Sequence, residues 1–324
     1  MKSNERAIVV SALKHAAPYI RLYKRKTFVL KAGGEIFADA AGTRALMEQV
    51  GILHQVGIRV VLVHGGGPQS TALAKALGVD PTFVAGRRVT DAESLNVSAM
   101  VLNGQINTRI LAACRDLDIP AVGISGVDAG LIRAHRRPPV ETEEGLVDYG
   151  HVGDIDGVDT EVLAKQLDNG LMPVVSPLSA DPDGELLNIN ADTVAAAIAA
   201  ELGAEKLILA TGAPGILEDA SDPRSLISYI DRAGLEKLVD SGKLTDGMLP
   251  KAAAIDAALA GGVERVHIIS SKLEDSLLLE VFTNEGTGTL VVHSIDALTA
   301  AEQAPGVEAP GAEAPGADAS GDTP

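Results

Sequence analysis

The chain has 324 residues, enough to bury a substantial core, and 46% of them are hydrophobic while only 2% are aromatic. Aliphatic side chains must therefore do the packing, which favours an α/β fold with short, buried parallel strands. The formal net charge of -17 disfavours binding to nucleic acids or anionic lipid, and few aromatic rings are available to stack on bases.

The cysteine content and hydrophobicity point to the cytoplasm. Cys114 is the only cysteine, so no disulfide can form within the chain, and we expect it to be a small buried side chain. No stretch approaches the roughly 18 uninterrupted apolar residues of a membrane span. The N-terminus also lacks the pattern of a signal peptide. We expect a cytoplasmic protein with no membrane or nucleic-acid partner.

Periodicity predicts alternating helices and strands. Residues 5–23 have the apolar spacing of a helix, in which Pro18 predicts a kink or an end. Strands are predicted at 27–31, 59–64, 121–124, 173–176, 206–210 and 266–269, with a β-rich stretch at 145–155. Helices are predicted at 43–56, from 68 to about 77, and at 94–117, 160–169, 192–202, 249–260 and 276–283. This order predicts an α/β fold with a mainly parallel open sheet, helices on both faces, and ligands at the carboxyl ends of the strands.

Repeats of Ala-Pro-Gly with acidic residues begin near residue 301. Such a composition has almost nothing to bury, so residues 301–324 are predicted to form a disordered acidic tail. Part of the acidic excess therefore belongs to the tail rather than to the folded body.

Two predicted strands end in glycine loops. Lys31-Ala-Gly-Gly34 follows the first strand, and His64-Gly-Gly-Gly-Pro68 follows the second, directly before a helix. Bare glycine backbone at a helix N-terminus can bind an anion through free amides and the helix dipole. Taken alone, each loop is equally compatible with a tight turn. Neither a P-loop nor the His-Arg-Asp set of protein kinases is present.

Three further segments carry charge or polarity where a ligand could use it. Arg87-Arg-Val-Thr-Asp91 offers a guanidinium that could clamp a carboxylate. Asn188-Ile-Asn-Ala-Asp192 opens a helix, and its polar residues could equally be a structural N-cap. Gly247-Met-Leu-Pro-Lys251 places a lysine at a helix start, where it opposes the helix dipole, so a functional reason is favoured.

Together these motifs resemble those of acetylglutamate kinases, which belong to the amino acid kinase family. The resemblance spans about residues 5–293 and includes, in order, Lys31-Ala-Gly-Gly34, His64-Gly-Gly-Gly-Pro-Gln69, Arg88-Val-Thr-Asp91, Gly123-Ile-Ser-Gly126, Asn188-Ile-Asn-Ala-Asp192, Lys206-Leu-Ile-Leu209 and Gly247-Met-Leu-Pro-Lys251. It implies the amino acid kinase fold, an αβα sandwich. It also implies ATP-dependent phosphorylation of the γ-carboxylate of N-acetyl-L-glutamate, the second step of arginine biosynthesis.

The resemblance also implies residue roles. Lys31 and Lys251 would flank the transferring phosphoryl group, and Asp192 would hold both ammonium groups. Acetylglutamate would bind at Gly66, Gly67, Arg88 and Asn188. ATP, with Mg²⁺, would bind at Gly34, Thr211 and Gly215. No residue is assigned as a metal ligand, and the remaining histidines, His267 among them, are interpreted as ordinary core or surface residues.

Regulation and organisation follow from the same resemblance. Residues 1–25 would form an N-terminal helix that assembles dimers into a hexamer, 26–190 a lobe for acetylglutamate, and 191–295 a lobe for ATP. L-Arginine would bind at Glu280 and Gly286 as a feedback inhibitor.

Some positions depart from the family pattern. Gly212 and Ala213 replace a usual Asp-Val pair, Ala32 replaces a bulkier residue, and residues 270–275 replace a usual Asp-Gly-Arg run. Two alternatives therefore stay open. The chain could phosphorylate another acid, such as acetylaminoadipate, or it could be a catalytically weak regulatory paralogue.

Overall fold

The computed structural model describes residues 3–84, 87–142, 145–219, 221–244, 247–283 and 286–297. The predicted tail at 301–324 lies outside these described residues. Within them, no helix combines the length and the apolar character that crossing a membrane would require.

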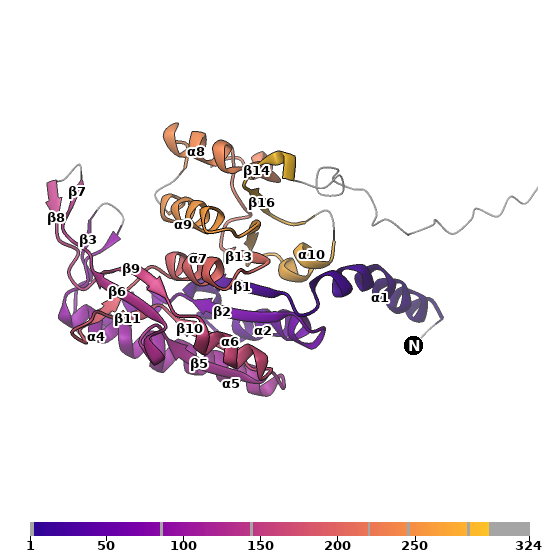
Figure 1. The fold of residues 1–324 in the computed structure, drawn as a ribbon, viewed down its shortest axis with the longest axis horizontal. Coiled ribbons are helices and arrows are strands. Elements are labelled where there is room, and N and C mark those ends of the chain that lie inside the picture. Colours follow the sequence, from indigo (N-terminus) through magenta and orange to yellow (C-terminus); the bar gives the residue numbers. More distant parts are fainter. Residues whose placement is uncertain are drawn as a thin grey trace, which may run out of the picture.

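A mainly parallel sheet forms the centre of the described part of the molecule (Figure 1). Its eight strands have the order β14-β16-β15-β13-β1-β2-β10-β5. Their bounds are β1 Thr27–Ala32, β2 Arg59–His64, β5 Ala121–Ser125, β10 Met172–Ser176, β13 Lys206–Thr211, β14 Tyr229–Asp231, β15 Arg265–Ser270 and β16 Thr289–Val292. Neighbouring strands from β15 to β5 are parallel, whereas β16 runs antiparallel to β15. The predicted sheet type is confirmed, but β14 and β16 were not predicted.

Helices cover both faces of this sheet, as predicted. One face packs against α2 (Ala40–Gln55), α5 (Thr108–Asp116) and α10 (Ser276–Phe282), and the other against α6 (Glu161–Asp168), α7 (Ala191–Glu201) and α9 (Leu249–Ala260). Because side chains alternate along a strand, Phe28 and Leu30 of β1 join the α2 side while Val29 joins the α7 side. Lys31, next in the alternation, therefore points toward α7.

The predicted helix at 94–117 is one helical path with an irregular middle. It consists of α4 (Ala92–Ala99), a π-helical stretch (Met100–Asn107, the π segment) and α5. Ala99 and Thr108, at its two junctions, keep right-handed helical backbone angles. A π stretch shifts the hydrogen bonds by one residue, and apolar spacing alone does not reveal that shift.

A second, four-stranded sheet lies beside the main one, in the order β12-β11-β6-β9. Its strands are β6 Ile132–Arg136, β9 Gly153–Val158, β11 Leu178–Ala180 and β12 Leu186–Asn188. Two hairpins extend from this region, β3 (Phe83–Val84) with β4 (Arg87–Arg88) and β7 (Val140–Thr142) with β8 (Gly145–Val147) (Figure 1). The β-rich stretch predicted at 145–155 belongs here, but β6, β11 and β12 were missed because they are short and of mixed polarity.

The remaining described elements are α3 (Gly67–Ala76), α8 (Arg232–Asp240), and short 3-10 turns at Gly34–Phe37, Asp128–Gly130, Pro223–Ser225 and Ile295–Ala297. α3 begins directly after the second glycine loop, with Pro68 in its first turn, where the missing N–H costs no hydrogen bond. α8 packs on α9 and β14. These elements complete the layers around the main sheet.

The N-terminal helix α1 (Ser3–Tyr23) reaches away from the body (Figure 1). It does not end at Pro18 but continues to Tyr23, at the cost of the one backbone hydrogen bond that proline cannot donate. Only its last part packs, with the Tyr23 ring edge-on to Phe28 at 5.2 Å between centroids. The apolar side chains along its length stay exposed: Ile8, Val9, Val10, Leu13 and Leu22.

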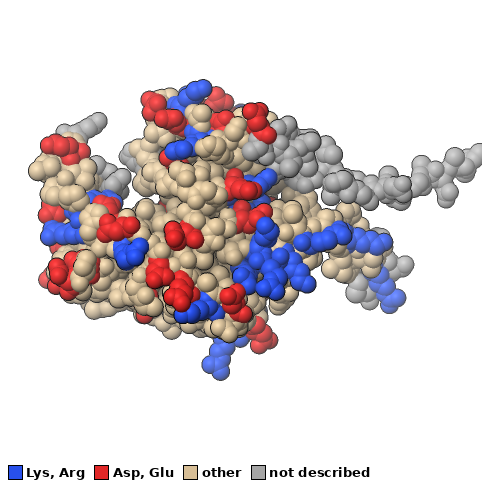
Figure 2. Space-filling model, viewed as in Figure 1, with Lys and Arg blue, Asp and Glu red and all other residues tan. Residues whose placement is uncertain are grey.

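Basic residues gather where α1 joins the body. Figure 2 shows Lys and Arg together on this part of the surface, and the junction contains Arg21, Lys24, Arg25 and Lys26. Lys26 forms an ion pair with Glu205 at 2.9 Å. The acidic excess of the chain is therefore not uniform over its surface.

Candidate functional site

A cavity of about 190 Å³ opens at the carboxyl ends of β1 and β2. Its lining includes six residues singled out from the sequence: Lys31, Gly66, Gly67, Arg88, Asn188 and Asp192. They come from β1, the loop after β2, β4, β12 and the first turn of α7. The fold thus brings together residues from segments that are far apart in the chain.

Two lysines converge on one carboxylate at this cavity. The Lys31 ammonium lies 2.9 Å from Oδ1 of Asp192, and the Lys251 ammonium lies 3.3 Å from Oδ2. Lys31 and Asp192 are buried, and only 19% of the Lys251 side chain is exposed. Burial alone would raise the pKa of Asp192, but the two ammonium groups outweigh it and hold the pKa below its ordinary value. Asp192 is therefore an anion shared by two cations.

Helix ends place these three groups. Asn190 caps α7 by accepting hydrogen bonds from the amides of Asp192 and Thr193, so this part of the motif is structural. Asp192 lies in the first turn of α7, where a carboxylate favours the helix dipole. Lys251 lies in the first turn of α9, which packs against α7, and there the dipole disfavours an ammonium group. The carboxylate of Asp192 offsets that repulsion.

The glycine loop after β2 forms another wall of the cavity. A Cβ atom on Gly66 would lie 2.6 Å from Ile106 and 2.7 Å from Leu102 of the π segment. A Cβ on Gly34 would lie 2.9 Å from the Cα of Gly66, so the two glycine loops also touch. Among the hydrogen bonds of the described residues, none uses the amide of Gly66 or Gly67. Free amides at the start of α3 provide a site for an anion.

Arg88 lies at the other side of the cavity. Its guanidinium donates to the hydroxyl of Thr71, reaches the carbonyl of Gly67 at 3.5 Å, and lies 4.9 Å from the centre of the Phe83 ring. Burial lowers the pKa of Arg88 from its usual value, yet a guanidinium stays charged in proteins. Within the part of the chain that the structure describes, no carboxylate forms an ion pair with this guanidinium, so its charge is available to a ligand.

An adjoining cavity of about 370 Å³ shares Arg88 and Asn188 with the first and is also lined by Arg137 and Pro250. Arg137 pairs with Asp154 through Nε at 3.0 Å and through Nη2 at 2.5 Å. From the sequence, Arg137 belongs to a local basic cluster at 133–137, which was interpreted as a solvated β-loop rather than as a binding site.

The residues expected to bind ATP, Gly34, Thr211 and Gly215, do not line the cavity that holds Lys31 and Asp192. Thr211 ends β13, the neighbour of β1, and its hydroxyl both donates to the carbonyl and accepts from the amide of Ala213. Gly215 is packed so closely that a Cβ there would lie 2.6 Å from Thr289 Oγ1. Gly34 lies nearer, against Gly66. A backbone turn is thus present at the end of β13, the strand that pairs with the Lys31 strand β1.

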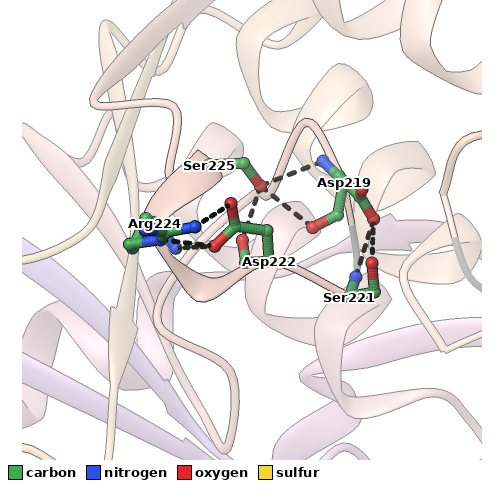
Figure 3. A network of polar contacts seen from close by, with 5 residues as sticks. All are labelled: Asp219, Ser221, Asp222, Arg224 and Ser225. Atoms are coloured by element: carbon green, nitrogen blue, oxygen red, sulfur yellow. Dashed lines mark hydrogen bonds and ion pairs between the residues drawn. The ribbon is translucent and has the colours of Figure 1, made fainter.

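The chain after Gly215 continues into a loop held by its own hydrogen bonds (Figure 3). The Ser225 hydroxyl donates to the carbonyls of Asp219 and Asp222 and accepts from the amide of Asp219. Ser221 bonds the carboxylate of Asp219, and Arg224 pairs with Asp222. These contacts lower the pKa of both aspartates, through Ser221 and Arg224 respectively. The described residues of this loop are therefore linked by contacts among themselves.

A second polar cluster lies at the other end of β13, where α1 meets the body. Lys206 Nζ lies 2.9 Å from Nε2 of His267, and His267 Nδ1 lies 2.6 Å from Oε1 of Glu280. The second carboxylate oxygen of Glu280 accepts from the amide of Thr287 at 2.6 Å. Burial acts to raise the pKa of Glu280, but the bonds to His267 and Thr287 prevail and lower it to about 2. Glu280 is therefore an anion inside the protein.

The two residues expected to bind L-arginine, Glu280 and Gly286, both belong to this cluster. Gly286 has a φ of 59°, and a Cβ there would lie 3.0 Å from Oε2 of Glu280. His267, interpreted from the sequence as an ordinary histidine, is buried between two charged groups, and burial is the main cause of its lowered pKa. Lys206 lies 5.1 Å from the centre of the Tyr23 ring at the end of α1. No local sequence pattern indicates that Lys206 and His267 are in contact, because they lie on separate strands, β13 and β15.

In the ranges that the structure describes, no group of three or more His, Cys, Asp or Glu residues is arranged to hold a metal ion. The acid nearest the lysines, Asp192, is already shared by both of them.

Comparison with known sequences gives close relatives. Residues 26–270 match the amino acid kinase family. Acetylglutamate kinase of Myxococcus xanthus is 49% identical over 288 residues, which cover 87% of this chain and 94% of the relative. Acetylglutamate kinase of Symbiobacterium thermophilum is 46% identical over 283 residues, covering 87% and 97%. That of Methanothermobacter thermautotrophicus is 43% identical over 288 residues, covering 87% and 98%.

Solved structures resemble the fold. N-acetylglutamate synthase from Neisseria gonorrhoeae, in complex with coenzyme A and N-acetyl-glutamate, aligns with a TM-score of 0.77 at 30% identity. The alignment covers 88% of this chain but 63% of the synthase, so this chain spans less than two thirds of that protein. The same synthase in complex with coenzyme A and L-arginine aligns with a TM-score of 0.76, covering 88% and 65%. An isopentenyl phosphate kinase, 20% identical with a TM-score of 0.57, shares the fold alone.

Proposed function

The chain belongs to the acetylglutamate kinases of the amino acid kinase family and is a kinase, and from this premise we propose that it phosphorylates N-acetyl-L-glutamate with ATP. The product would be N-acetyl-L-glutamyl 5-phosphate, an intermediate of arginine biosynthesis. The observation that carries the proposal is the convergence of Lys31 and Lys251 on Asp192, beside the free amides of the glycine loop.

The chemistry matches what this cavity offers. A side-chain carboxylate with an ordinary pKa of about 4.3 is already ionised at neutral pH, so no general base is needed to activate it. The difficulty is to bring this anion to the polyanionic triphosphate of ATP. Positioning and cationic stabilisation dominate such phosphoryl transfers. Lys31 and Lys251 would supply the positive charge, and Asp192 would keep both ammonium groups at the position where the phosphoryl group passes.

The substrate would lie across the two cavities. Its reacting carboxylate would accept hydrogen bonds from the Gly66 and Gly67 amides, and its α-carboxylate end would meet Arg88 and Asn188, which line both cavities. Guanidinium groups bind carboxylates in two-point geometry, which suits Arg88 for this role. The space beyond them, lined by Arg137, would take the acetyl group.

ATP would lie at the carboxyl ends of β1 and β13, with phosphates near Gly34 and the nucleoside near the turn from Thr211 to Gly215. Mg²⁺ would be held by the phosphate oxygens of the nucleotide, because the Asp192 carboxylate is already paired with two lysines. When bound, the ion would supply further positive charge to the phosphates. The enzyme would work in the cytoplasm, where a chain with a single cysteine needs no disulfide.

Feedback by L-arginine, in a hexamer assembled through α1, forms the regulatory part of the proposal. Glu280 is a buried anion beside Gly286, and its carboxylate could pair with a guanidinium. This cluster contacts Tyr23 of α1 through Lys206. The exposed apolar side chains of α1 would be covered by α1 of another subunit. The synthase that resembles this chain in fold was solved with L-arginine.

An assay of ADP release with a panel of acids tests the proposal. We expect turnover with N-acetyl-L-glutamate and little or none with N-acetyl-L-aminoadipate, aspartate, glutamate or carbamate. The variant Asp192→Asn serves as the control, since contaminating kinases would not respond to it. Turnover restricted to another acid, or activity that Asp192→Asn leaves unchanged, would contradict the proposed function.

A further inference from the structure

His64 is a buried polar residue that the proposed chemistry leaves unused. It ends β2, is completely buried, and immediately precedes the glycine loop that lines the cavity. In the sheet it is paired with Ala32, whereas Lys31 is paired with Val63. Because neighbouring residues of a strand point to opposite faces, His64 points away from the Lys31 side. It therefore cannot touch a substrate that lies against Lys31.

The His64 side chain instead connects the glycine loop to the π segment. Its Nδ1 lies 3.2 Å from the carbonyl oxygen of Gly65, and its Nε2 lies 3.3 Å from Nδ2 of Asn107. Burial lowers the pKa of His64 to about 4, so the ring is neutral at neutral pH. A neutral ring satisfies both contacts when Nδ1–H donates to Gly65 and Nε2 accepts from Asn107.

Asn107 is itself held from the opposite side. Its Nδ2 also donates to the carbonyl of Val174 in β10, at 3.0 Å. A Cβ on Gly123 of β5 would lie only 1.9 Å from the Asn107 Oδ1. Glycine at position 123 is thus required by the place that the Asn107 amide occupies. Asn107 is fixed between β2, β10 and β5, the strands at this end of the sheet.

The π segment also touches the glycine loop directly. Leu102 and Ile106 lie where a side chain on Gly66 would be, so they press on the bare backbone of the loop. Asn103 accepts a hydrogen bond from Ser176 at the end of β10. Asn103 and Asn107 therefore tie the π segment to the sheet at two points, while its apolar residues hold Gly66. π stretches within helices are frequent at functional sites.

These contacts lead to a role that rests on the proposed function. We infer that His64 and Asn107 are a buried positioning pair, which fixes the carbonyl of Gly65 so that the Gly66 and Gly67 amides face the acceptor carboxylate. Neither residue touches the substrate. Their effect is on the orientation of the peptide units that follow Gly65, since a peptide whose carbonyl is held cannot rotate its plane. A glycine loop without such a restraint would sample many orientations.

Four substitutions test this role. His64→Leu and Asn107→Leu remove the connection at either end, and Gly123→Ala displaces the Asn107 amide without altering a polar group. His64→Asn keeps a donor where Nδ1 lies but is too short to reach Asn107. The matched control is Cys114→Ala, two helical turns beyond Asn107 and buried in the same core, where Cys114 contacts Met47 but not the loop.

The kinetic result should separate positioning from stability. We expect His64→Leu, Asn107→Leu and Gly123→Ala to lower kcat by about 10²-fold, which is typical of small misplacements of reacting groups. His64→Asn should lose clearly less than His64→Leu, because the bond to Gly65 is kept. Cys114→Ala should lower the melting temperature and leave kcat unchanged. A normal kcat in His64→Leu, or an equal loss of kcat in Cys114→Ala, would overturn the inference.

Amide exchange measured by NMR provides a readout that does not depend on turnover. The amide of Gly65 donates to Ala32 and that of Ser70 donates to the carbonyl of Gly66. Both should exchange faster in His64→Leu and Asn107→Leu than in Cys114→Ala. Should the wild-type protein fail to phosphorylate acetylglutamate, the proposed function falls but the exchange rates still decide the positioning role. Equal exchange in all variants would refute it.

Discussion

The ammonium group of Lys31 lies 2.9 Å from a carboxylate oxygen of Asp192, and both side chains are buried. The other oxygen of Asp192 faces Lys251 at 3.3 Å. One anion between two cations leaves a net positive charge at this point, which is what a transferring phosphoryl group requires.

If the lysines act on the transition state, either substitution to alanine should reduce turnover far more than binding. We expect Lys31→Ala and Lys251→Ala to lower kcat by about 10²-fold or more, as for other groups that stabilise developing charge. The KM for acetylglutamate should change much less. Steady-state kinetics with both substrates provide the measurement. A lysine variant with a nearly normal kcat would remove that lysine from the mechanism.

Removal of the shared carboxylate tests the pair from the other side. Asp192→Asn keeps the size of the side chain but leaves two neighbouring ammonium groups without their anion, one of them buried. Breaking a buried ion pair on one side typically costs about 3–5 kcal/mol. We expect a clear loss in the free energy of unfolding, measured by urea denaturation, together with loss of activity. An unchanged free energy of unfolding would mean that water, rather than Asp192, stabilises the charges of the two lysines.

Arg88→Lys should separate binding of the two substrates. An ammonium group cannot donate to Thr71 and Gly67, lie on Phe83 and bind a carboxylate at two points simultaneously. Loss of a hydrogen bond to a charged group costs about 1.5–3 kcal/mol, so the KM for acetylglutamate should rise about tenfold or more. The KM for ATP should stay near its wild-type value. The exposed Arg44→Lys, on the opposite side of the sheet, is the control, and equal effects on both substrates would make Arg88 structural.

His64 predicts a specific pH dependence of stability. Its pKa is lowered from an ordinary value of 6.5 to about 4, since the buried ring, near Phe37, Gly65 and Asn107, loses solvation when charged. The unfolded chain therefore binds the proton first as pH falls, and folding stability decreases between pH 6.5 and 4. This shift corresponds to about 3 kcal/mol. The loss due to Glu280, whose pKa is lowered from 4.5 to about 2, falls mostly at lower pH, between 4.5 and about 2.

Urea denaturation at several pH values measures this effect. The variant His64→Asn has no titrating ring, so the slope of its unfolding free energy between pH 6.5 and 4 should be shallower than that of the wild type. The buried His267 remains in both proteins and cancels in the comparison. Identical slopes in the two proteins would show that His64 keeps its ordinary pKa in the folded state.

The sequence permitted a good prediction of the main sheet because its strands are aliphatic and end in recognisable residues. Lys31 near the end of β1 and His64 at the end of β2 fall where they were expected, and parallel pairing brings both loops to one edge. The contacts of Asp192 with the two lysines were implied by the family resemblance alone. The ion pairs of Asp192 depend on α7 packing against α9, and no local pattern states which helices become neighbours.

Other features of the structure were not predicted from the sequence, also for physical reasons. The π segment has ordinary helical residues, and no local pattern in the sequence indicates its contacts with the sheet and with Gly66. Lys206 and His267 meet only because β13 and β15 pair in register, with Ile208 opposite His267. A lysine and a histidine in separate strands carry no motif, whereas Glu280 and Gly286 were reached through the family resemblance.

Assembly and feedback give the final prediction, which links α1 to the Glu280 cluster. The apolar residues of α1 are exposed, with Leu13 at 63% and Ile8 at 61%, and the described residues of the same subunit do not cover them. At its other end, α1 packs on α10, the helix that carries Glu280, and Tyr23 contacts Lys206. A ligand bound at Glu280 would therefore act on α1, and through it on other subunits.

Two variants separate assembly from ligand binding. We expect the full chain to sediment as a hexamer whose activity falls with arginine, and a variant that begins at Lys26 to sediment as a dimer that arginine does not inhibit. Glu280→Gln should stay hexameric, but half-inhibition should require an arginine concentration about tenfold higher or more. The reason is that a bond between two charged groups becomes a bond to a neutral amide. Sedimentation velocity and arginine titration of the three proteins provide the measurements. A full-length dimer, or inhibition that survives removal of α1 unchanged, would disprove the coupling while leaving the kinase assignment intact, because neither α1 nor Glu280 contributes to the cavity that holds Lys31 and Asp192.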